Sequence, residues 1–316
     1  MEKPVMSRRD FVQHAVVGAV AAGVLRHAAA GEAPSAPLRL GGPIFAKTES
    51  PEELARAHRA LGYRAAYCPN VPSGDADRIR AFAEAFARHD VVIAEVGRWC
   101  NLMEADGEKR RKNLDNVIDG LALAEAIGAR CCVNIAGSCH PEVWYGPHPD
   151  NLSARFFDAA VENARAIIDA VQPVRAKFAY EMMGWSLPDS PDAYLRMVQA
   201  VDRKAFAVHL DPCNLVNCPE RFYRNTDLLN ECFDKLGPWL VSCHAKDLTW
   251  DVEMNVHFRE VAPGAGALDY TTYLKRLAAL PDPPPLMLEH LSGEEEYDAA
   301  RRHILGLGGQ LGMRFE

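Results

Sequence analysis

Residues 177–211 read KFAYEMMGWSLPDSPDAYLRMVQAVDRKAFAVHLD, and this stretch decides the fold. It begins and ends with short apolar runs, Lys177–Glu181 and Phe206–Asp211, which have the length and composition of buried β-strands. Between them lies a helical pattern, Pro191–Val201, which Ser190 precedes as a capping residue. A strand, a helix and a second strand in this order form the repeating unit of a parallel sheet covered by helices.

The same alternation of strand and helix extends along the rest of the chain. The predicted strands are Leu38–Gly41, Arg64–Tyr67, Val91–Val96, Cys131–Ile135, Lys177–Glu181, Phe206–Asp211, Leu240–His244 and Leu286–Glu289. The predicted helices are Pro51–Leu61, Ala76–His89, Lys109–Ile127, Ala154–Val171, Pro191–Val201, Glu220–Leu236, Tyr270–Leu280 and Glu294–Leu305. Eight such units predict an α/β protein with a closed (β/α)8 TIM barrel. The alternative, an open doubly wound sheet, usually has a Gly-rich phosphate loop after an early strand, and Gly41-Gly42-Pro43 lacks that pattern.

Residues 1–30 have the pattern of an export signal. Arg8 and Arg9 precede an apolar run, Ala15–Leu25, and small residues follow it. Paired arginines before such a run resemble the twin-arginine signal of bacteria, and the run is shorter than the roughly 20 residues that span a bilayer. We therefore predict a signal peptide at 1–30, a single domain at 31–316, export by the twin-arginine machinery and a periplasmic location.

The composition of the chain excludes several classes of protein. Of its 316 residues, 48% are apolar, which supplies enough surface for a buried core and argues against a disordered chain. The formal net charge of −8 disfavours binding to the phosphate backbone of a nucleic acid. The nine cysteines are an odd number, so at least one thiol is unpaired. A small molecule, and no nucleic acid, is the expected partner.

Four of the predicted strands end on a residue that can bind a metal: Glu181, Asp211, His244 and Glu289. In a (β/α)8 barrel the C-terminal ends of the strands meet at one mouth, so these four side chains are expected to converge. Three carboxylates and one imidazole suit one divalent cation, Mn²⁺, Mg²⁺ or Co²⁺, and zinc is also compatible. One such residue alone is typical of a structural polar group, whereas four in phase favour a metal site.

These residues and their neighbours resemble the xylose isomerase-like superfamily, which contains sugar isomerases and epimerases, inosose dehydratases and apurinic-site endonucleases. The resemblance spans residues 38–310 and rests on Glu181 after the fifth strand, Asp211 in His-Leu-Asp-Pro, His244 in His-Ala-Lys-Asp and Glu289 in Leu-Glu-His. In the epimerase branch these positions hold one metal ion, and the two glutamates carry protons. The resemblance therefore implies that Glu181 and Glu289 are both metal ligands and catalytic residues.

The surroundings of the expected metal site differ from those of the ketose epimerases. Asn214 stands where that branch has a His, Leu187 replaces a second Glu, and Trp250 replaces an Arg. The segment that begins at Trp250 is long for a connection in a barrel, and such loops are often functional. It contains His257 and Arg259, and either is a candidate to replace the missing Arg.

Other residues near the strand ends are predicted to contact the substrate. Lys246 lies two residues beyond His244 and therefore in the same phase, which would let it hold a substrate oxygen. Tryptophan rings near the strand ends can stack on a sugar. His209 is instead predicted to be a hydrogen-bonded core residue. The predicted substrate-binding residues are Lys246, Asn214, Glu95, Trp99, Trp185, His257 and Arg259.

The expected activity is proton transfer at the carbon next to a carbonyl group. A divalent metal makes that C–H bond acidic, and two glutamates can remove the proton and return it. Export and the lack of a phosphate-binding loop favour a non-phosphorylated sugar or keto-sugar, so a metal-dependent isomerase or epimerase is predicted. Two alternatives remain open: a lyase or dehydratase that acts on keto-glycosides or inososes with the same metal site, and a non-catalytic sugar-binding protein. The sequence also leaves open a homo-oligomer.

Overall fold

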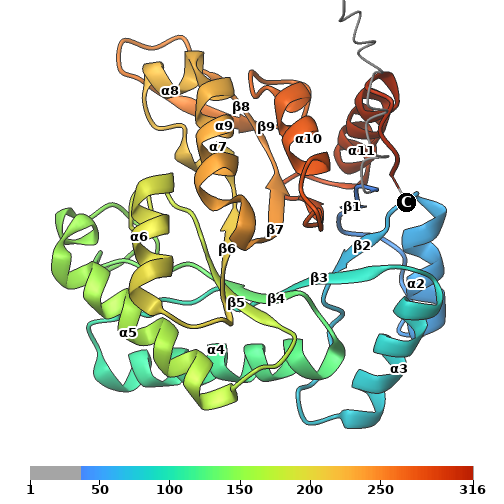
Figure 1. Ribbon diagram of the computed structural model, residues 1–316, viewed down its shortest axis with the longest axis horizontal. Coiled ribbons are helices and arrows are strands. Elements are labelled where there is room, and N and C mark those ends of the chain that lie inside the picture. The colour runs from blue at the N-terminus through green and yellow to red at the C-terminus, as the bar shows by residue number, and fades with distance from the viewer. Residues whose placement is uncertain (1–36, 316) are drawn as a thin grey trace, which may run out of the picture. The chain divides into compact units, whose positions relative to one another are not determined.

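Eight parallel strands form the centre of the structure, a computed structural model that describes residues 37–315. They close into a barrel in the order β1-β10-β7-β6-β5-β4-β3-β2, and helices surround it (Figure 1). The barrel strands are β1 (Leu40–Gly41), β2 (Ala65–Tyr67), β3 (Val92–Gly97), β4 (Cys131–Asn134), β5 (Lys177–Glu181), β6 (Phe206–Leu210), β7 (Leu240–Ala245) and β10 (Leu286–Leu288). The predicted (β/α)8 TIM barrel is therefore confirmed.

Several helices of the outer layer begin or end where local sequence signals predict, whereas α11 extends beyond its predicted end at Leu305. The long helices are α2 (Pro51–Ala60), α3 (Ala76–Arg88), α4 (Gly107–Ile127), α5 (Ala154–Val171), α6 (Pro191–Val201), α9 (Asn225–Leu236), α10 (Tyr270–Ala278) and α11 (Glu294–Gln310). Three short ones are η1 (Pro149–Leu152), α7 (Pro212–Leu215) and η2 (Gly237–Trp239). The Ser50 hydroxyl caps α2 and the Ser190 hydroxyl caps α6, each by accepting a hydrogen bond from a backbone N–H in the first turn. Gly128 ends α4 at φ 80°, a left-handed conformation that glycine adopts without steric cost.

The helix predicted at Glu220–Leu236 is broken into two, α8 (Pro219–Tyr223) and α9. The break lies at Arg224, next to the buried Asn225. The Asn225 amide donates one hydrogen bond to the Phe222 carbonyl oxygen, at 2.8 Å, and a second to a carbonyl oxygen in the loop before α10. A side chain that bonds to the backbone in this way offers an alternative to a continuous helix, and periodicity alone does not reveal it.

The long segment after β7 is predicted from the sequence as a loop. In the structure it contains an antiparallel hairpin. Its strands are β8 (Asp247–Trp250) and β9 (Phe258–Val261). The carboxylate of Asp247 holds the chain beyond the hairpin, because it accepts hydrogen bonds from the N–H groups of Gly264 and Gly266 at 3.0 and 3.1 Å. A Cβ atom at Gly266 would lie 2.2 Å from this carboxylate, so only a glycine fits there.

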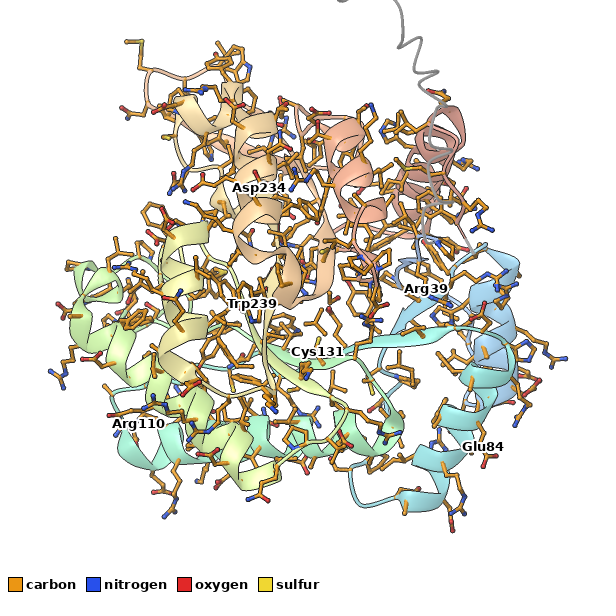
Figure 2. The ribbon with its side chains drawn as sticks, viewed as in Figure 1. Arg39, Glu84, Arg110, Cys131, Asp234 and Trp239 are labelled. Carbon is orange, nitrogen blue, oxygen red and sulfur yellow. The ribbon has the colours of Figure 1, made fainter. Side chains whose placement is uncertain are left out.

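The interior of the barrel is filled by small side chains. Cys131, Ala179, Ala207 and Val241 form one buried cluster and come from four neighbouring strands. Figure 2 shows Cys131 among the barrel strands, whereas Glu84 extends from an outer helix. Because this layer is packed, the barrel is a solid core rather than a channel, and only its ends are available for a functional site.

The predicted signal peptide, the predicted start of the domain and the state of the cysteines can be compared with the structure. The signal peptide predicted at 1–30 and the domain start predicted at 31 lie outside the described residues. Within residues 37–315, no helix combines the length and the apolar character that a membrane span requires. All nine cysteines lie in this part of the chain, and all are free thiols in the structure.

Candidate metal centre

The four predicted metal ligands meet at the C-terminal ends of the barrel strands. Glu181 is the last residue of β5, Asp211 follows β6, His244 lies in β7 and Glu289 follows β10. One ligand atom from each residue lies within 4.8 Å of the ligand atoms of the other three. The parallel direction of the strands explains this convergence, since all their carboxyl ends reach the same mouth.

The imidazole of His244 and the ammonium of Lys246 lie among the three carboxylates. His244 Nδ1 is 3.0 Å from Glu181 Oε1, 3.0 Å from Glu289 Oε2 and 3.4 Å from Asp211 Oδ2. Lys246 Nζ is 2.9 Å from both Asp211 Oδ2 and Glu289 Oε2. His244, Lys246 and Asp211 are buried almost completely, so these charges interact with little screening by solvent.

Burial alone would raise the pKa values of these carboxyl groups, but the neighbouring bases have the larger effect. His244 and Lys246 lower the pKa of Glu289 to about 2, and Lys246 and His244 hold the pKa of Asp211 well below its usual range. In turn, burial opposes the charge on Lys246, yet the carboxylates raise its pKa. Asp211 and Glu289 are therefore ionised at neutral pH, which is the form that binds a metal.

Two oxygen atoms of the cluster have no hydrogen-bond partner in the part of the chain that the structure describes. They are Asp211 Oδ2 and Glu289 Oε2, and both are buried. Both oxygens instead lie 2.9 Å from the Lys246 ammonium, an ion pair that offsets their charge. A divalent cation would offset the same charge and bind the same two oxygens. Three oxygen donors and one nitrogen fit such an ion, so the cluster is a candidate divalent-metal site.

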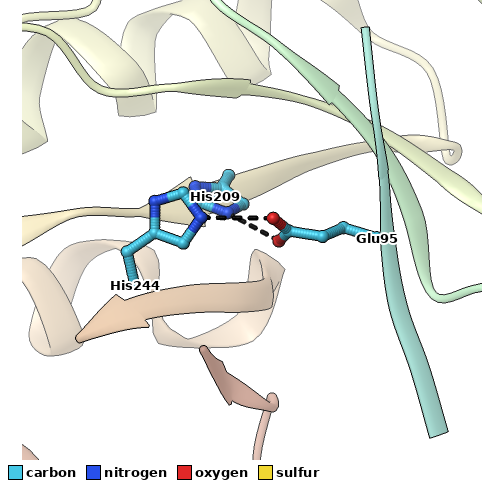
Figure 3. A group of neighbouring side chains, drawn as sticks. All are labelled: Glu95, His209 and His244. Carbon is cyan, nitrogen blue, oxygen red and sulfur yellow. Dashed lines mark hydrogen bonds and ion pairs between the residues drawn. The ribbon is translucent and has the colours of Figure 1, made fainter. Parts of the chain in front are cut away.

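Next to this cluster, Glu95 of β3 links the imidazoles of His209 and His244 (Figure 3). Its Oε1 is 3.1 Å from His244 Nε2, and its Oε2 is 2.9 Å from His209 Nε2. Because Nε2 of His244 is bonded to Glu95, Nδ1 is the nitrogen that faces the three carboxylates. A carboxylate that orients a histidine in this way is a common partner of metal-binding histidines. His209 is fully buried and hydrogen-bonded, as the sequence analysis predicted.

The structure places Glu95, which was predicted to contact the substrate, inside this buried network. Glu95 is 1% exposed, and the Ser242 hydroxyl donates a further hydrogen bond to it at 2.8 Å, so both of its oxygens are occupied. Burial disfavours its charge, but His209 and His244 hold the pKa of Glu95 well below its usual range. Glu95 therefore orients His244. Sequence alone gave no sign of this, because the two partners lie on distant strands.

Replacing Glu95 by Gln is expected to weaken divalent-metal binding by about 10–100-fold, the usual cost of losing such a partner. The amide keeps the size of the side chain but removes the charge that orients His244. Titration of the metal-free protein with Mn²⁺, followed by competition with a chelator, measures the change. Glu294→Gln, an exposed site at the start of α11, is the matched control. Unchanged affinity in a folded Glu95→Gln protein would contradict the orienting role.

A cavity of about 360 Å³ lies at the candidate metal site. Glu181 and Glu289 line it together with three of the predicted substrate-binding residues, Lys246, Asn214 and Trp99. Asn214 Nδ2 donates a hydrogen bond to Glu181 Oε1 at 3.1 Å, so the residue that replaces the expected His contacts a candidate ligand. The cavity is within the range of about 300–1,000 Å³ that is typical of small-molecule sites.

The structure places the other predicted substrate-binding residues elsewhere. Trp185 is 61% exposed in the loop after β5 and does not line this cavity. His257 and Arg259 lie on the β8–β9 hairpin and face Asp251, at 3.5 and 3.1 Å. Both therefore pair with an acidic residue of the hairpin itself, and neither lines this cavity.

Six residues that were not predicted as site residues also line the cavity: Ile135, Trp144, Tyr145, Met183, Glu260 and His290. Trp144 and Tyr145 come from the loop after β4, Glu260 belongs to β9, and His290 follows β10. Glu260 Oε1 is 3.1 Å from His290 Nδ1. Since successive side chains of a strand point to opposite faces, Glu260 faces the site and its neighbour Arg259 does not. The alternation of side chains along β9 is the signal in the sequence that indicates Glu260, but this segment is predicted as a loop.

The fold and the ligand set define a (β/α)8 protein with a candidate divalent-metal site at the mouth of its barrel. The sequence model of the family described as "Xylose isomerase-like TIM barrel" matches residues 55–306. The chain belongs to this family. A comparison with curated protein sequences finds no match.

Solved structures with a similar fold include proteins that are named for different reactions. A 3-keto-D-glucoside 4-epimerase, YcjR, from E. coli has a TM-score of 0.63 at 14% identity, covering 86% of this chain and 99% of its own. A xylose isomerase-like TIM barrel protein from Mycobacterium smegmatis in complex with magnesium has a TM-score of 0.61 at 18% identity. The match covers 86% of this chain and 96% of that protein. A probable 3-DHS dehydratase, AsbF, from Bacillus anthracis has a TM-score of 0.62 at 13% identity. The match covers 85% of this chain and 99% of that protein. At these identities the likeness shows the fold alone, so the reaction has to be argued from the site.

Proposed function

We propose that this protein is a metal-dependent isomerase or epimerase that moves a proton at the carbon next to the carbonyl group of a non-phosphorylated sugar or keto-sugar. The cluster of Glu181, Asp211, His244 and Glu289 carries the proposal, because it brings one ligand atom from each residue within 4.8 Å of the other three. Membership of the family supports an enzyme that acts on a small carbohydrate. The name of the E. coli relative supports a keto-sugar in particular.

The two glutamates are the proposed proton carriers. A bound divalent ion, Mn²⁺, Mg²⁺ or Co²⁺ with Zn²⁺ also compatible, would polarise the substrate carbonyl and make the neighbouring C–H bond acidic. One glutamate removes the proton from that carbon, and the other glutamate returns a proton. Glu181 ends β5 and Glu289 follows β10, two strands that β6 and β7 separate in the barrel, so the two glutamates would reach the substrate from different sides. Lys246 holds a substrate oxygen by its charge.

The position to which the proton returns decides the product. Return to the opposite face of the same carbon gives an epimer, and return to the neighbouring carbon gives an isomer. If the substrate carries a leaving group one carbon further on, the electron pair of the broken C–H bond expels it, and the leaving group takes up a proton. That outcome is the lyase or dehydratase alternative, and analysis of the products separates it from isomerisation.

Exchange of substrate hydrogen with deuterated water tests the proposal. Keto-sugars and free ketoses incubated in D₂O with the Mn²⁺-loaded protein are expected to gain one deuterium next to the carbonyl group. The exchange is expected to stop after treatment with a chelator and to return when Mn²⁺ is added. Binding of sugars without any exchange, across the whole panel, would indicate the non-catalytic sugar-binding protein instead.

We also propose that the chain is exported to the periplasm by the twin-arginine machinery. The support is the sequence of residues 1–30, with Arg8 and Arg9 before the apolar run. Fractionation of bacteria that express the full chain, with and without replacement of both arginines by lysine, tests this. Retention of the arginine form in the cytoplasm would contradict it. Gel filtration of the purified protein tests the homo-oligomer that the sequence leaves open.

A further inference from the structure

The mouth of the barrel contains a second cavity, which the proposed reaction does not use. Its volume is about 550 Å³, larger than the cavity of about 360 Å³ at the candidate metal site. Trp99, Glu289 and His290 line both cavities, so the two adjoin at these residues. A ring that presents its reacting carbon to Glu289 would have one side open to the larger cavity. A single sugar in the smaller cavity would leave the larger one to solvent.

The lining of the larger cavity suits the flat face of a ring. It includes the apolar side chains of Pro43, Pro69, Val71 and Tyr297. It also includes Asn70, whose exposed amide has no hydrogen-bond partner among residues 37–315. Charged side chains, Arg98 and Glu289 among them, complete the lining. Apolar side chains combined with polar groups are typical of sites that bind a ring and fix its orientation. The ring hydroxyls of a sugar and a polar substituent of an aromatic group would both reach the amide.

Hydrogen bonds behind the lining connect the segments that form this cavity to the rest of the fold. The Ser73 hydroxyl, in the loop after β2, donates to Asp119 of α4 at 2.5 Å, and Arg98 donates to the same carboxylate at 3.3 Å. The Tyr67 hydroxyl, at the end of β2, donates to the carbonyl oxygen of Leu288 at 3.0 Å. The loops after β2 and β3 are therefore tied to the barrel and to α4, which preorganises the cavity for a ligand.

Trp99 forms the boundary between the two cavities. Its indole packs over Gly97, where an added Cβ would lie 2.7 Å from Nε1, so the backbone of its own strand supports the ring. Trp99 is nevertheless 43% exposed, which leaves the rest of the indole available to a ligand. A rigid, exposed indole beside two cavities can stack against a ring in either of them.

We propose that the larger cavity binds the aglycone ring of a glycoside, so that the preferred substrate is a keto-glycoside with two rings and not a free sugar. This inference rests on the proposed function, which places the reacting sugar ring in the smaller cavity. The aglycone ring lies between Trp99 and the Asn70–Val71 segment, and Asn70 hydrogen-bonds to its polar substituent.

The test compares two substrates and two variants. We expect kcat/KM to be higher for a keto-disaccharide or an aryl keto-glycoside than for the free keto-sugar. Asn70→Trp fills the larger cavity and is expected to lower the ratio of glycoside to free-sugar kcat/KM roughly tenfold, which corresponds to about 1.4 kcal/mol. Asn255→Trp, at an exposed position of the β8–β9 hairpin outside both cavities, is the matched control and is expected to keep the ratio. The two glycosides show whether a sugar or an aromatic ring is preferred.

The outcomes separate this inference from the proposed function. An unchanged ratio in a folded, active Asn70→Trp protein, or equal kcat/KM for glycosides and free sugars, would overturn the aglycone site and leave the proposed function intact. A second readout does not require turnover: an unoxidised phenyl glycoside is expected to quench tryptophan fluorescence in the parent protein and to bind Asn70→Trp about tenfold more weakly. Equal binding by both proteins would overturn the inference even if no substrate reacts, whereas absence of exchange with every sugar would reject the proposed function alone.

Discussion

Replacing Glu289 by Gln is expected to slow the exchange of substrate hydrogen with deuterated water by about 10²–10⁴-fold, the usual contribution of a group that transfers a proton. Glu289 is the carboxylate that both cavities share. Its Oε2 lies in the ligand cluster, 3.0 Å from His244 Nδ1, and its Oε1 is 3.6 Å from His290 Nε2. One oxygen is therefore available to the metal while the other is left to take a proton.

Glutamine has the same shape as glutamate and can still offer an oxygen to a metal, but it cannot accept the proton. Metal content and thermal stability measured beside the exchange rate separate a lost proton carrier from a lost metal site. Glu294→Gln, on the exposed start of α11, is the control and is expected to exchange at the parent rate. Parent-like exchange by a metal-loaded Glu289→Gln protein would show that Glu289 does not carry the proton.

Replacing Lys246 by Met is expected to destabilise the metal-free protein by about 3–5 kcal/mol, the cost of removing one partner from a buried ion pair. Lys246 is 2% exposed, and its ammonium lies 2.9 Å from both Asp211 and Glu289. Without it, three carboxylates would remain together with only His244 to offset their charge. A divalent cation would offset the same charge, so the loss is expected to be smaller in the Mn²⁺-loaded protein.

Urea unfolding of both forms, with and without Mn²⁺, measures this difference. Lys235→Met is the matched control, because Lys235 is partly exposed and pairs with Asp192 and Glu231 on the surface. Surface pairs contribute about 0–1 kcal/mol, and the effect of this control is not expected to depend on the metal. An equal loss of stability for Lys246→Met in both forms would show that the metal and the ammonium do not compensate the same carboxylates.

The parts of the site that sequence predicted are those attached to regular strands. Glu181, Asp211, His244 and Glu289 each stand at a strand end, and strand ends can be found from short apolar runs and helix signals. Once eight such units predict a closed barrel, the direction of every strand is known, and the convergence of the four side chains follows. Lys246 was found in the same way, because it lies in phase with His244.

The residues that sequence misplaced lie on loops or depend on partners far along the chain. Trp185 follows β5 but is exposed, whereas Trp144 and Tyr145 reach the cavity from the loop after β4. Loops have no periodicity from which the direction of a side chain can be predicted. Glu95 was expected to meet a substrate, and only the folded barrel shows that His209 and His244 occupy its carboxylate.

The amino-acid sequence by itself thus determined the alternation of strands and helices, the closed barrel and the four side chains at its mouth, because these follow from local periodicity and from strand direction. The tertiary structure alone decided which loops cover the mouth, that Glu260 and not Arg259 faces the site, and that a second cavity adjoins the first at Trp99. These features depend on contacts between segments that are distant in the chain, and no local pattern of residues encodes such contacts.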